Sequence, residues 1–384
     1  MIRAIAVIGT GLIGTSVALA ASRRGVTVFL SDRDPLAART AAALGAGRTR
    51  PPAVPVDLAV LAVPPSKVGA VLAEQQARGL AHCYTDVASV KVLPERTALS
   101  LAPDPSSYVG GHPMAGRERS GPLAARAELF EGRPWALTPS PFTSPTALRR
   151  ARELAVLCGA VPVVTQSASH DEAVALTSHV PHLLASLMAA RLSGGPAGAT
   201  RFAGQGLRDV TRIAAGDPGL WGDILQANAP AVAGVVREVH ADLSRLVAAL
   251  DMLSGPDAGQ RAGAMRTMVD LLDRGVAGLA GIRPGGPGGP GGPSGGSRVR
   301  VAVADRAGEL PRLLSGAVRA GADAERVTVE DAGPGRLSVR FGVAPCLAGR
   351  LTAALVAEGW DARGENSVYA EAYEEGPVRP AVRT

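Results

Sequence analysis

A glycine-rich hexapeptide that directly follows an apolar run is the feature that most constrains the fold of this chain. Residues 2–8 (IRAIAVI) have the composition of a buried strand, and the next six residues open a helical pattern. In a GxGxxG segment between a strand and a helix, the glycines permit a tight turn and let backbone N–H groups approach a pyrophosphate. The residues predicted to form this dinucleotide site are Gly9, Gly11, Leu12, Ile13 and Gly14. A turn without a ligand is the alternative explanation for the glycines.

Asp32 ends the next predicted strand, eighteen residues after Gly14. A carboxylate at that place can accept hydrogen bonds from an adenosine ribose, and it repels a 2′-phosphate. Arg33 follows directly and could tolerate such a phosphate. The pattern therefore favours NAD as the cofactor and leaves NADP open.

Short apolar runs alternate with helical stretches up to about residue 165, and this alternation predicts a Rossmann-type doubly wound parallel sheet over residues 1–165. The predicted strands are residues 2–8, 26–30, 58–63, 135–137 and 161–164. Residues 166–283 are helical in pattern throughout, with long stretches at 172–191 and 228–253. They predict an all-helical domain that binds substrate or forms a dimer.

The sequence changes character again after residue 283. Residues 284–296 read PGGPGGPGGPSGG, so residues 284–297 are predicted to be a linker. Residues 298–366 alternate between strand and helix periods in the order βαββα, which predicts a small α+β domain. Residues 367–384 are predicted to be a tail.

Composition excludes several classes of protein. No run of eighteen apolar residues occurs, so no membrane span is expected. The 40 basic residues exceed the 34 acidic ones, but they are scattered arginines apart from two lysines, and aromatic residues make up 3%, so a nucleic-acid partner is not expected. The three cysteines form no CxxC pair, which argues against a disulfide framework or a zinc site. The N-terminus has no signal-peptide pattern, so a cytoplasmic location is expected.

Four of the six histidines lie in two polar segments, and this concentration suggests a site. His112 falls in residues 110–121, which we expect to be a glycine-rich loop that lines the site, although a surface loop with an incidental histidine is the simpler alternative. His179 and His182 are three residues apart and share a helical face, apart from a kink expected at Pro181. No third ligand for a zinc ion is evident nearby, so no metal site is predicted.

Two further segments carry charged side chains of interest. Lys91 follows an apolar strand, which places it at the carboxyl edge of the predicted sheet, where ligands bind. Arg208 and Arg212 are four apart on one helical face. They could pair with Asp209 or Asp217, or they could form a fork for a substrate carboxylate.

Five ordered motifs give this chain a resemblance to a known family. The segments GTGLIGTS, DVASVK, GHPMAGRERSG, HDEAVALTSHVPH and GLRDVTRIAAGDPGLWGDI resemble those of the prephenate dehydrogenases, a family that includes the arogenate dehydrogenases. The resemblance covers nearly all of residues 1–280. The part after the linker, with residues 305–310 (DRAGEL) between strand and helix, resembles an ACT domain, an amino-acid-sensing regulatory module.

The resemblance implies an NAD-linked oxidative decarboxylation of prephenate to 4-hydroxyphenylpyruvate in tyrosine biosynthesis. It implies that His112 binds the ring hydroxyl and takes its proton while hydride leaves the same carbon, and that Ser89 binds this hydroxyl or holds the imidazole. Arg212 would bind the carboxylate of the pyruvyl side chain. The other residues expected at the substrate are Lys91, Glu118, His179, His182, Arg208 and Trp221.

The resemblance also implies a homodimer and a tyrosine effector for the ACT-like domain. Arogenate and 4-amino-4-deoxyprephenate remain alternative substrates. A β-hydroxyacid dehydrogenase has the same nucleotide motif but does not explain GHPMAG or TRIA. A non-catalytic NAD-binding sensor is disfavoured because His112, Ser89 and Arg212 are all present.

Overall fold

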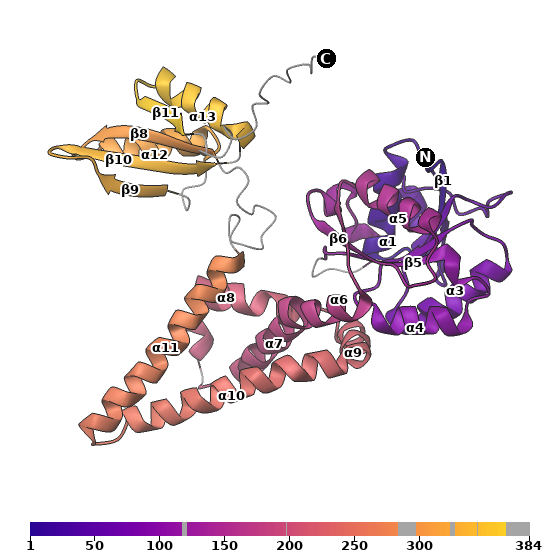
Figure 1. The fold of residues 1–384 in the computed structure, drawn as a ribbon, viewed down its shortest axis with the longest axis horizontal. Coiled ribbons are helices and arrows are strands. Elements are labelled where there is room, and N and C mark those ends of the chain that lie inside the picture. Colours follow the sequence, from indigo (N-terminus) through magenta and orange to yellow (C-terminus); the bar gives the residue numbers. More distant parts are fainter. Residues whose placement is uncertain (117–120, 197, 283–296, 323–326, 344, 366–384) are drawn as a thin grey trace, which may run out of the picture. The chain divides into compact units, whose positions relative to one another are not determined.

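The computed structural model describes residues 1–116, 121–196, 198–282, 297–322, 327–343 and 345–365. The chain divides into two compact units, Met1–Leu243 and Ser244–Thr384, and each is described by itself (Figure 1). Residues 284–296 of the predicted linker and the predicted tail, 367–384, lie outside the described residues.

One sheet of seven strands organises the described part of the first unit, in the order β2-β1-β3-β4-β5-β6-β7. The strands are β1 (Ala4–Ile8), β2 (Thr27–Ser31), β3 (Leu58–Leu61), β4 (Tyr84–Asp86), β5 (Tyr108–Pro113), β6 (Pro134–Thr138) and β7 (Val161–Val164). The helices between them are α1 (Leu12–Ser22), α2 (Pro35–Ala43), α3 (Val68–Ala77), α4 (Val92–Leu101) and α5 (Pro145–Leu157). The predicted doubly wound sheet is confirmed, but β6 runs antiparallel to β5, whereas the other neighbours are parallel.

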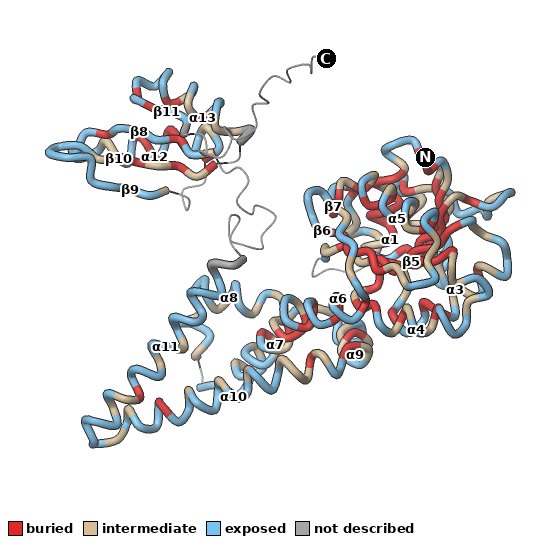
Figure 2. Tube along the Cα trace, in the orientation of Figure 1, coloured by how far each residue is buried: buried red, intermediate tan, exposed pale blue. Residues whose placement is uncertain are grey.

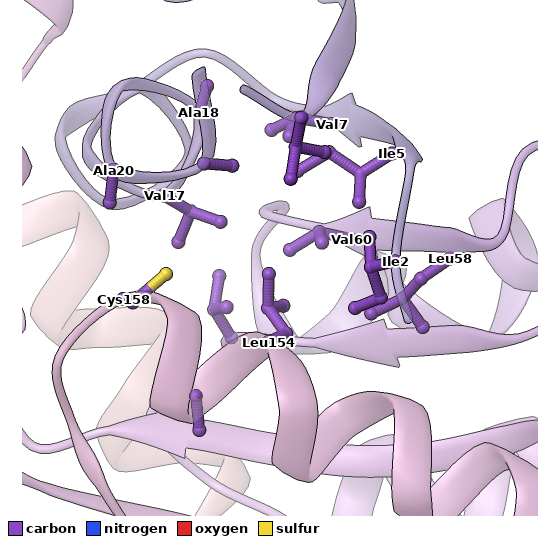
Figure 3. Close-up of a cluster of buried hydrophobic side chains, with 14 of the residues drawn as sticks. Ile2, Ile5, Val7, Val17, Ala18, Ala20, Leu58, Val60, Leu154 and Cys158 are labelled. Atoms are coloured by element: carbon purple, nitrogen blue, oxygen red, sulfur yellow. The ribbon is translucent and has the colours of Figure 1, made fainter. Parts of the chain in front are cut away.

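Alternate residues of the central strands point to opposite faces of this sheet, as the two-residue period of a strand requires. Ile5 and Val7 pack on one face with Val17 of α1 and Leu154 of α5 (Figure 3). Ala6 lies on the other face, in a second cluster that includes residues of α3 and α4. Buried residues accordingly concentrate along the strands (Figure 2). Both faces are covered, which explains why the strands read as nearly continuous apolar runs.

The expectation of a loop at residues 110–121 is wrong at its start, because Gly110 to Pro113 belong to β5. His112 is paired with Ala136 of β6. A Cβ on Gly110 would lie 2.4 Å from Thr138 Oγ1, and one on Gly111 would lie 2.6 Å from the carbonyl oxygen of Asp86. These glycines therefore permit a close approach between strands rather than a turn.

The helices between residues 167 and 282 contain the remaining described residues of the predicted site. They are α6 (Ser167–Val174), α7 (Val180–Ser193), α8 (Gln205–Thr211), α9 (Pro218–Ala227), α10 (Ala229–Leu253) and α11 (Ala258–Ile282). The helical stretch predicted over 172–191, with a kink expected at Pro181, contains a π-helical turn, Ala175–His179, that ends two residues before this proline. Proline has no N–H and crowds the preceding turn, so a local widening of the helix accommodates it.

The stretch Ser167–Ser193 is long and apolar enough to cross a membrane, by length and composition only. The same stretch contains five buried polar side chains, those of Ser167, His170, Asp171, His179 and His182. All five have a hydrogen-bonding or ring partner within the first unit. We therefore interpret it as a core helix of the protein.

The described part of the second unit contains a four-stranded antiparallel sheet, in the order β11-β8-β10-β9. Its elements are β8 (Ser297–Ala304), α12 (Glu309–Arg319), β9 (Val327–Asp331), β10 (Arg336–Val343), α13 (Pro345–Ala357) and β11 (Asp361–Glu365). The order is βαββαβ, so the expected pattern lacked the last strand. The sequence of β11, DARGE, buries only Ala362 among its described side chains, which is too little apolar character to signal a strand.

Candidate active site

The predicted nucleotide turn follows β1 and precedes α1. Gly9 has φ +99°, and a Cβ there would lie 2.1 Å from the carbonyl oxygen of Ala62. A Cβ on Gly14 would lie 2.0 Å from the carbonyl oxygen of Gly9. A Cβ on Gly11, in contrast, would meet no described atom within 4 Å. Two glycines thus permit close packing, and the third leaves open space at the N-terminus of α1.

The N-terminus of α1 fits an anionic ligand. Gly11 is its N-cap and supplies no side-chain cap, and the first turn, which the structure describes in full, has no acidic side chain. The free N–H groups and the helix dipole at such an end attract phosphate. Leu12 and Ile13 are half-buried in this first turn and pack against the core of the sheet.

Asp32 is fixed at the end of β2. One carboxylate oxygen accepts hydrogen bonds from the backbone N–H of Thr10 (2.6 Å) and its hydroxyl (2.9 Å), and the other accepts the N–H of Asp34 (2.9 Å). A pocket of about 820 Å³ is lined by Asp32 together with Phe29, Arg39 and others. The carboxylate thus lines this cavity and is also hydrogen-bonded to Thr10 of the glycine turn.

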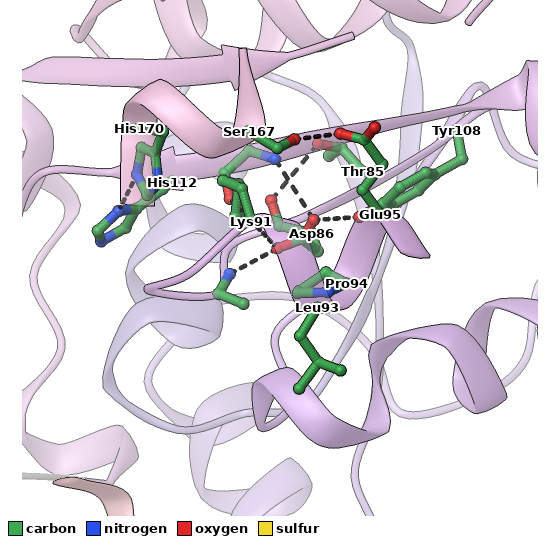
Figure 4. Close-up of polar contacts among 12 residues, drawn as sticks. Thr85, Asp86, Lys91, Leu93, Pro94, Glu95, Tyr108, His112, Ser167 and His170 are labelled. Atoms are coloured by element: carbon green, nitrogen blue, oxygen red, sulfur yellow. Dashed lines mark hydrogen bonds and ion pairs between the residues drawn. The ribbon is translucent and has the colours of Figure 1, made fainter. Parts of the chain in front are cut away.

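His112 is the first member of a chain of three polar side chains. Its Nδ1 lies 2.9 Å from Nε2 of His170 (Figure 4). Nδ1 of His170 in turn lies 2.8 Å from Oδ1 of Asp171. In the sequence, His170 stands out only as one of the four clustered histidines, and Asp171 was not predicted to be a site residue. The adjacency of a histidine and an acid on α6 was the available signal.

The environment of His112 disfavours its charged form. Burial lowers the pKa of His112 well below its ordinary value of 6.5, and positive charge on His170, Lys91 or His179 acts in the same direction. His112 is therefore neutral near neutral pH, as a general base must be.

Lys91 is completely buried, and protein groups bind its ammonium. Nζ forms an ion pair with Asp86 and lies 2.5 Å from the carbonyl oxygen of Gly111 (Figure 4). Asp86 also accepts a hydrogen bond from the hydroxyl of Tyr108 (2.5 Å) and the N–H of Ala88 (2.7 Å). Burial lowers the pKa of Lys91, and the Asp86 carboxylate opposes this effect. The prediction that Lys91 binds substrate is therefore wrong, because its buried ammonium is bound by Asp86 and Gly111.

Ser89 and Glu118 are two other residues predicted at the site. Ser89 is half-buried in the loop between β4 and α4. Glu118 lies outside the described residues.

His179, His182 and Trp221 are brought together by α7 and α9. The rings of His182 and Trp221 are stacked, with centroids 3.6 Å apart and planes at 11°. His179 meets the edge of Trp221 at 6.0 Å, and burial lowers its pKa to about 4. A Cβ on Gly216 would lie 2.4 Å from Nε1 of Trp221, so this glycine permits the aromatic packing.

Arg208 lies in the last turn of α8, and Arg212 lies four residues later, directly after this helix. The helix α8 ends at Thr211, and Arg212 begins a 3₁₀ turn, Arg212–Ala215. Both side chains are exposed. Burial lowers the pKa of His182, and the backbone of Ile213, in the turn that begins at Arg212, opposes this effect.

The acids first considered as partners of these arginines have other hydrogen bonds. Asp209 accepts one from Gln205 (2.8 Å), and Asp217 caps α9 through the N–H of Leu220 (2.8 Å).

A glycine turn for a dinucleotide and a neutral histidine on the same sheet define a dehydrogenase of the Rossmann class. Family models agree with this class. That of the prephenate dehydrogenase nucleotide-binding domain matches residues 17–164, and that of the prephenate dehydrogenase dimerization domain matches residues 166–260. The chain belongs to the prephenate dehydrogenase family.

Individual relatives cover most of the chain. It is 41% identical over 320 residues to the probable prephenate dehydrogenase NovF of Streptomyces niveus, covering 83% of this chain and 88% of the relative. It is 34% identical to a cyclohexadienyl dehydrogenase of Zymomonas mobilis, covering 65% and 89%.

Solved structures show the same architecture. An arogenate dehydrogenase of Synechocystis is 26% identical, covers 71% of this chain and 99% of its own, and has a TM-score of 0.54. A prephenate dehydrogenase of Aquifex aeolicus, in complex with hydroxyphenyl propionate and NAD+, has a TM-score of 0.64. It is 24% identical and covers 73% of this chain and 98% of its own, so this likeness concerns the fold alone.

The two lysines allow a direct test of the buried ion pair. Lys91→Met removes the ammonium and leaves the Asp86 carboxylate buried without its cation, so we expect the free energy of unfolding to fall by about 3 to 5 kcal/mol. Lys67→Met makes the same change at an exposed site and should change it by less than about 0.5 kcal/mol. Urea unfolding of both variants measures the difference, and equal losses would contradict the assigned role of Lys91.

Proposed function

We propose that this protein is an NAD-dependent prephenate dehydrogenase that converts prephenate to 4-hydroxyphenylpyruvate for tyrosine synthesis. The observation that carries the proposal is the neutral His112, held on the nucleotide-binding sheet of a member of this family. A cytoplasmic location belongs to the proposal, because such an enzyme needs the cell's pool of free NAD.

The chemistry follows from the residues of the chain. NAD, when bound, accepts hydride from the ring carbon that bears the hydroxyl. His112 takes the hydroxyl proton at Nε2, because its Nδ1 is engaged by His170. The bond to the ring carboxylate breaks and carbon dioxide leaves. The electron pair of that bond completes the aromatic ring, and the ring oxygen takes the proton back from His112. Aromatisation makes the reaction irreversible, so the protein's main task is to orient the substrate and to hold a neutral base.

The remaining residues orient the substrate in this proposal. Arg212 binds the pyruvyl carboxylate from its 3₁₀ turn, and Ser89 binds the ring hydroxyl or the imidazole. His179, His182 and Trp221 form one wall of the pocket, with Arg208 and Glu118 contributing to substrate binding. We reassign Lys91 from substrate binding to support of β5, since its ammonium is occupied by Asp86 and Gly111.

Arogenate is the second candidate substrate. The relatives that favour it are the cyclohexadienyl dehydrogenase and the arogenate dehydrogenase, and 4-amino-4-deoxyprephenate has the same ring skeleton. Rates of NADH formation with prephenate and arogenate, followed by absorbance, distinguish the two. We expect prephenate to have the larger kcat/KM, and a preference for arogenate would overturn the assigned substrate.

Replacement of the base should affect turnover rather than binding. We expect His112→Asn to keep affinity for NAD and prephenate and to lower kcat by about a hundredfold or more, the scale of a lost general base. Steady-state kinetics with prephenate, together with NAD titration, measures this. Near-normal turnover in the variant would rule out His112 as the base.

Arg212→Ala should have the opposite signature. A charge-assisted bond to a carboxylate distant from the reacting carbon forms in both the ground and transition states, so its loss raises KM and changes kcat little. We expect KM for prephenate to rise at least about tenfold. An unchanged KM with a collapsed kcat would contradict the role of Arg212 as the carboxylate anchor.

We also propose that residues 298–366 form an ACT-like domain that binds tyrosine and inhibits the enzyme. The supporting observations are the βαββαβ order and Gly308, which has φ +92° between β8 and α12 and no described atom within 4 Å of a Cβ. A missing side chain there lets the amino and carboxyl groups of a ligand approach the backbone. The other domains that we propose are a nucleotide-binding domain (1–165) and a helical domain (166–283).

Substitution at this glycine tests the tyrosine site in the full chain. Asparagine tolerates positive φ, so Gly308→Asn should keep the uninhibited rate and lose inhibition by tyrosine. Gly333→Asn, at φ +100° in the turn between β9 and β10, is the matched control and should retain inhibition. Equal inhibition of all three proteins would place tyrosine in the active site as a competitor.

A homodimer is the proposed assembly. The family's dimerization domain matches residues 166–260, and exposed apolar side chains recur at spacings of three and four along α11. These side chains are Met265, Val269, Leu272, Val276 and Leu279. A stripe of this kind is typical of a helix that packs on another surface. Sedimentation equilibrium should give twice the mass of one chain, and a monomer mass would contradict the assembly.

A further inference from the structure

We propose that His170 and Asp171 fix the tautomer of His112 and share the proton that it gains, so that both are positioning residues for the base. The inference rests on the proposed function for the identity of the reaction. The hydrogen-bonded chain itself is a property of the free protein, with consecutive distances of 2.9 Å and 2.8 Å.

Asp171 is fixed as a carboxylate at the start of α4. Its Oδ1 accepts the backbone N–H of Lys91 at 2.7 Å, and its Oδ2 accepts that of Val92 at 2.9 Å. These donors lie at a helix N-terminus, where the dipole favours negative charge. Nδ2 of Asn228 also holds the backbone carbonyl of Asp171 at 2.8 Å. The carboxylate is buried, and the N–H groups of Lys91 and Val92 and the ring of His170 orient it.

The direction of each hydrogen bond then follows. An ionised carboxylate only accepts hydrogen bonds, so Nδ1 of His170 carries a proton and donates a hydrogen bond to Asp171. A neutral His170 therefore has a bare Nε2, which must accept from its neighbour. The donor is Nδ1–H of His112. His112 is left with a bare Nε2, the nitrogen that can remove a proton from a substrate hydroxyl.

The same chain stabilises the product of proton transfer. When Nε2 of His112 takes a proton, the imidazolium shares its Nδ1 proton with His170, whose own charge is then balanced by Asp171. The other ionisable groups that face His112 are Lys91 and His179, and positive charge on either disfavours the imidazolium. The Asp171 carboxylate opposes that effect through His170.

A purely structural alternative exists, in which Asp171 only caps α4 and His170 only fills space. The two accounts differ in the protonation of His112. Without an accepting Nε2 on His170, the hydrogen bond between the two histidines no longer favours a proton on Nδ1 of His112. If His170 presented an N–H instead, His112 would hold its proton on Nε2 and could not act as a base.

The tautomer can be measured without substrate. We would record ¹⁵N spectra of the imidazoles in the full-length protein and assign His112 from the spectrum of His112→Asn. The expected result is His112 neutral with the proton on Nδ1, and His170 likewise protonated on Nδ1. A proton on Nε2 of His112 would overturn the proposal whatever substrate the enzyme uses.

Two substitutions at His170 test the catalytic consequence. The side-chain carbonyl of Gln can accept Nδ1–H of His112, whereas Leu cannot. We expect His170→Leu to lower kcat at least about tenfold with KM for prephenate within about threefold, and His170→Gln to recover most of the loss. The same change at an exposed position, His82→Leu, is the control and should leave kcat unchanged.

The outcomes distinguish the hydrogen-bonded relay of His112, His170 and Asp171 from the proposed function. Equal losses in His170→Leu and His170→Gln, or a loss confined to KM, would overturn the relay. If His170→Leu does not fold, the Gln variant and the tautomer of the wild-type protein still decide it. If the wild-type protein does not oxidise prephenate, the proposed function fails, and the ¹⁵N spectra alone test the relay.

Discussion

The buried ion pair between Lys91 and Asp86 is the interaction on which the rest of the site depends. Taking both charges out of water is costly, and the structure offsets that cost with additional hydrogen bonds from the Tyr108 hydroxyl and to the Gly111 carbonyl. These contacts join β4, β5 and the start of α4. The carbonyl that accepts from Lys91 belongs to the residue directly before His112, so the pair fixes the backbone from which the base projects.

The backbone of the same lysine connects this ion pair to the histidines. The N–H of Lys91 donates to Asp171, which orients His170 and through it His112. His112 is thus held twice, at its backbone by a buried ammonium and at its ring by a neighbouring imidazole. The ammonium also contributes to the low pKa of His112, after burial itself and His170. Support and electrostatic tuning of the base therefore come from the same groups.

The nucleotide-binding fold could be predicted from the sequence, because its signals are local. A strand, a glycine turn and a helix lie within about twenty residues, and the packing at Gly9 and Gly14 explains why no other residue fits. The strand at His112 could not be predicted in this way. Its glycines are required by contacts with Thr138 and with Asp86, on strands that are remote in sequence.

The relay was missed for the same reason. His170 meets His112 across 58 residues of chain, and no local pattern states that α6 faces the end of β5. The burial of Lys91 was also not evident, since a lysine after a strand is as compatible with a ligand as with a buried carboxylate. Motif resemblance pointed to His112 as the proposed base, but only tertiary contacts identify the residues that orient its ring.

The pH dependence of kcat/KM for prephenate tests most directly the claim that His112 is a neutral base held by this framework. The base is active only when deprotonated, so activity is lost as pH falls through the pKa of His112, which burial places well below 6.5. We expect kcat/KM to stay constant from about pH 8 down to about pH 6.5, with the midpoint of the acid limb well below that value. A midpoint at or above 6.5 would contradict it.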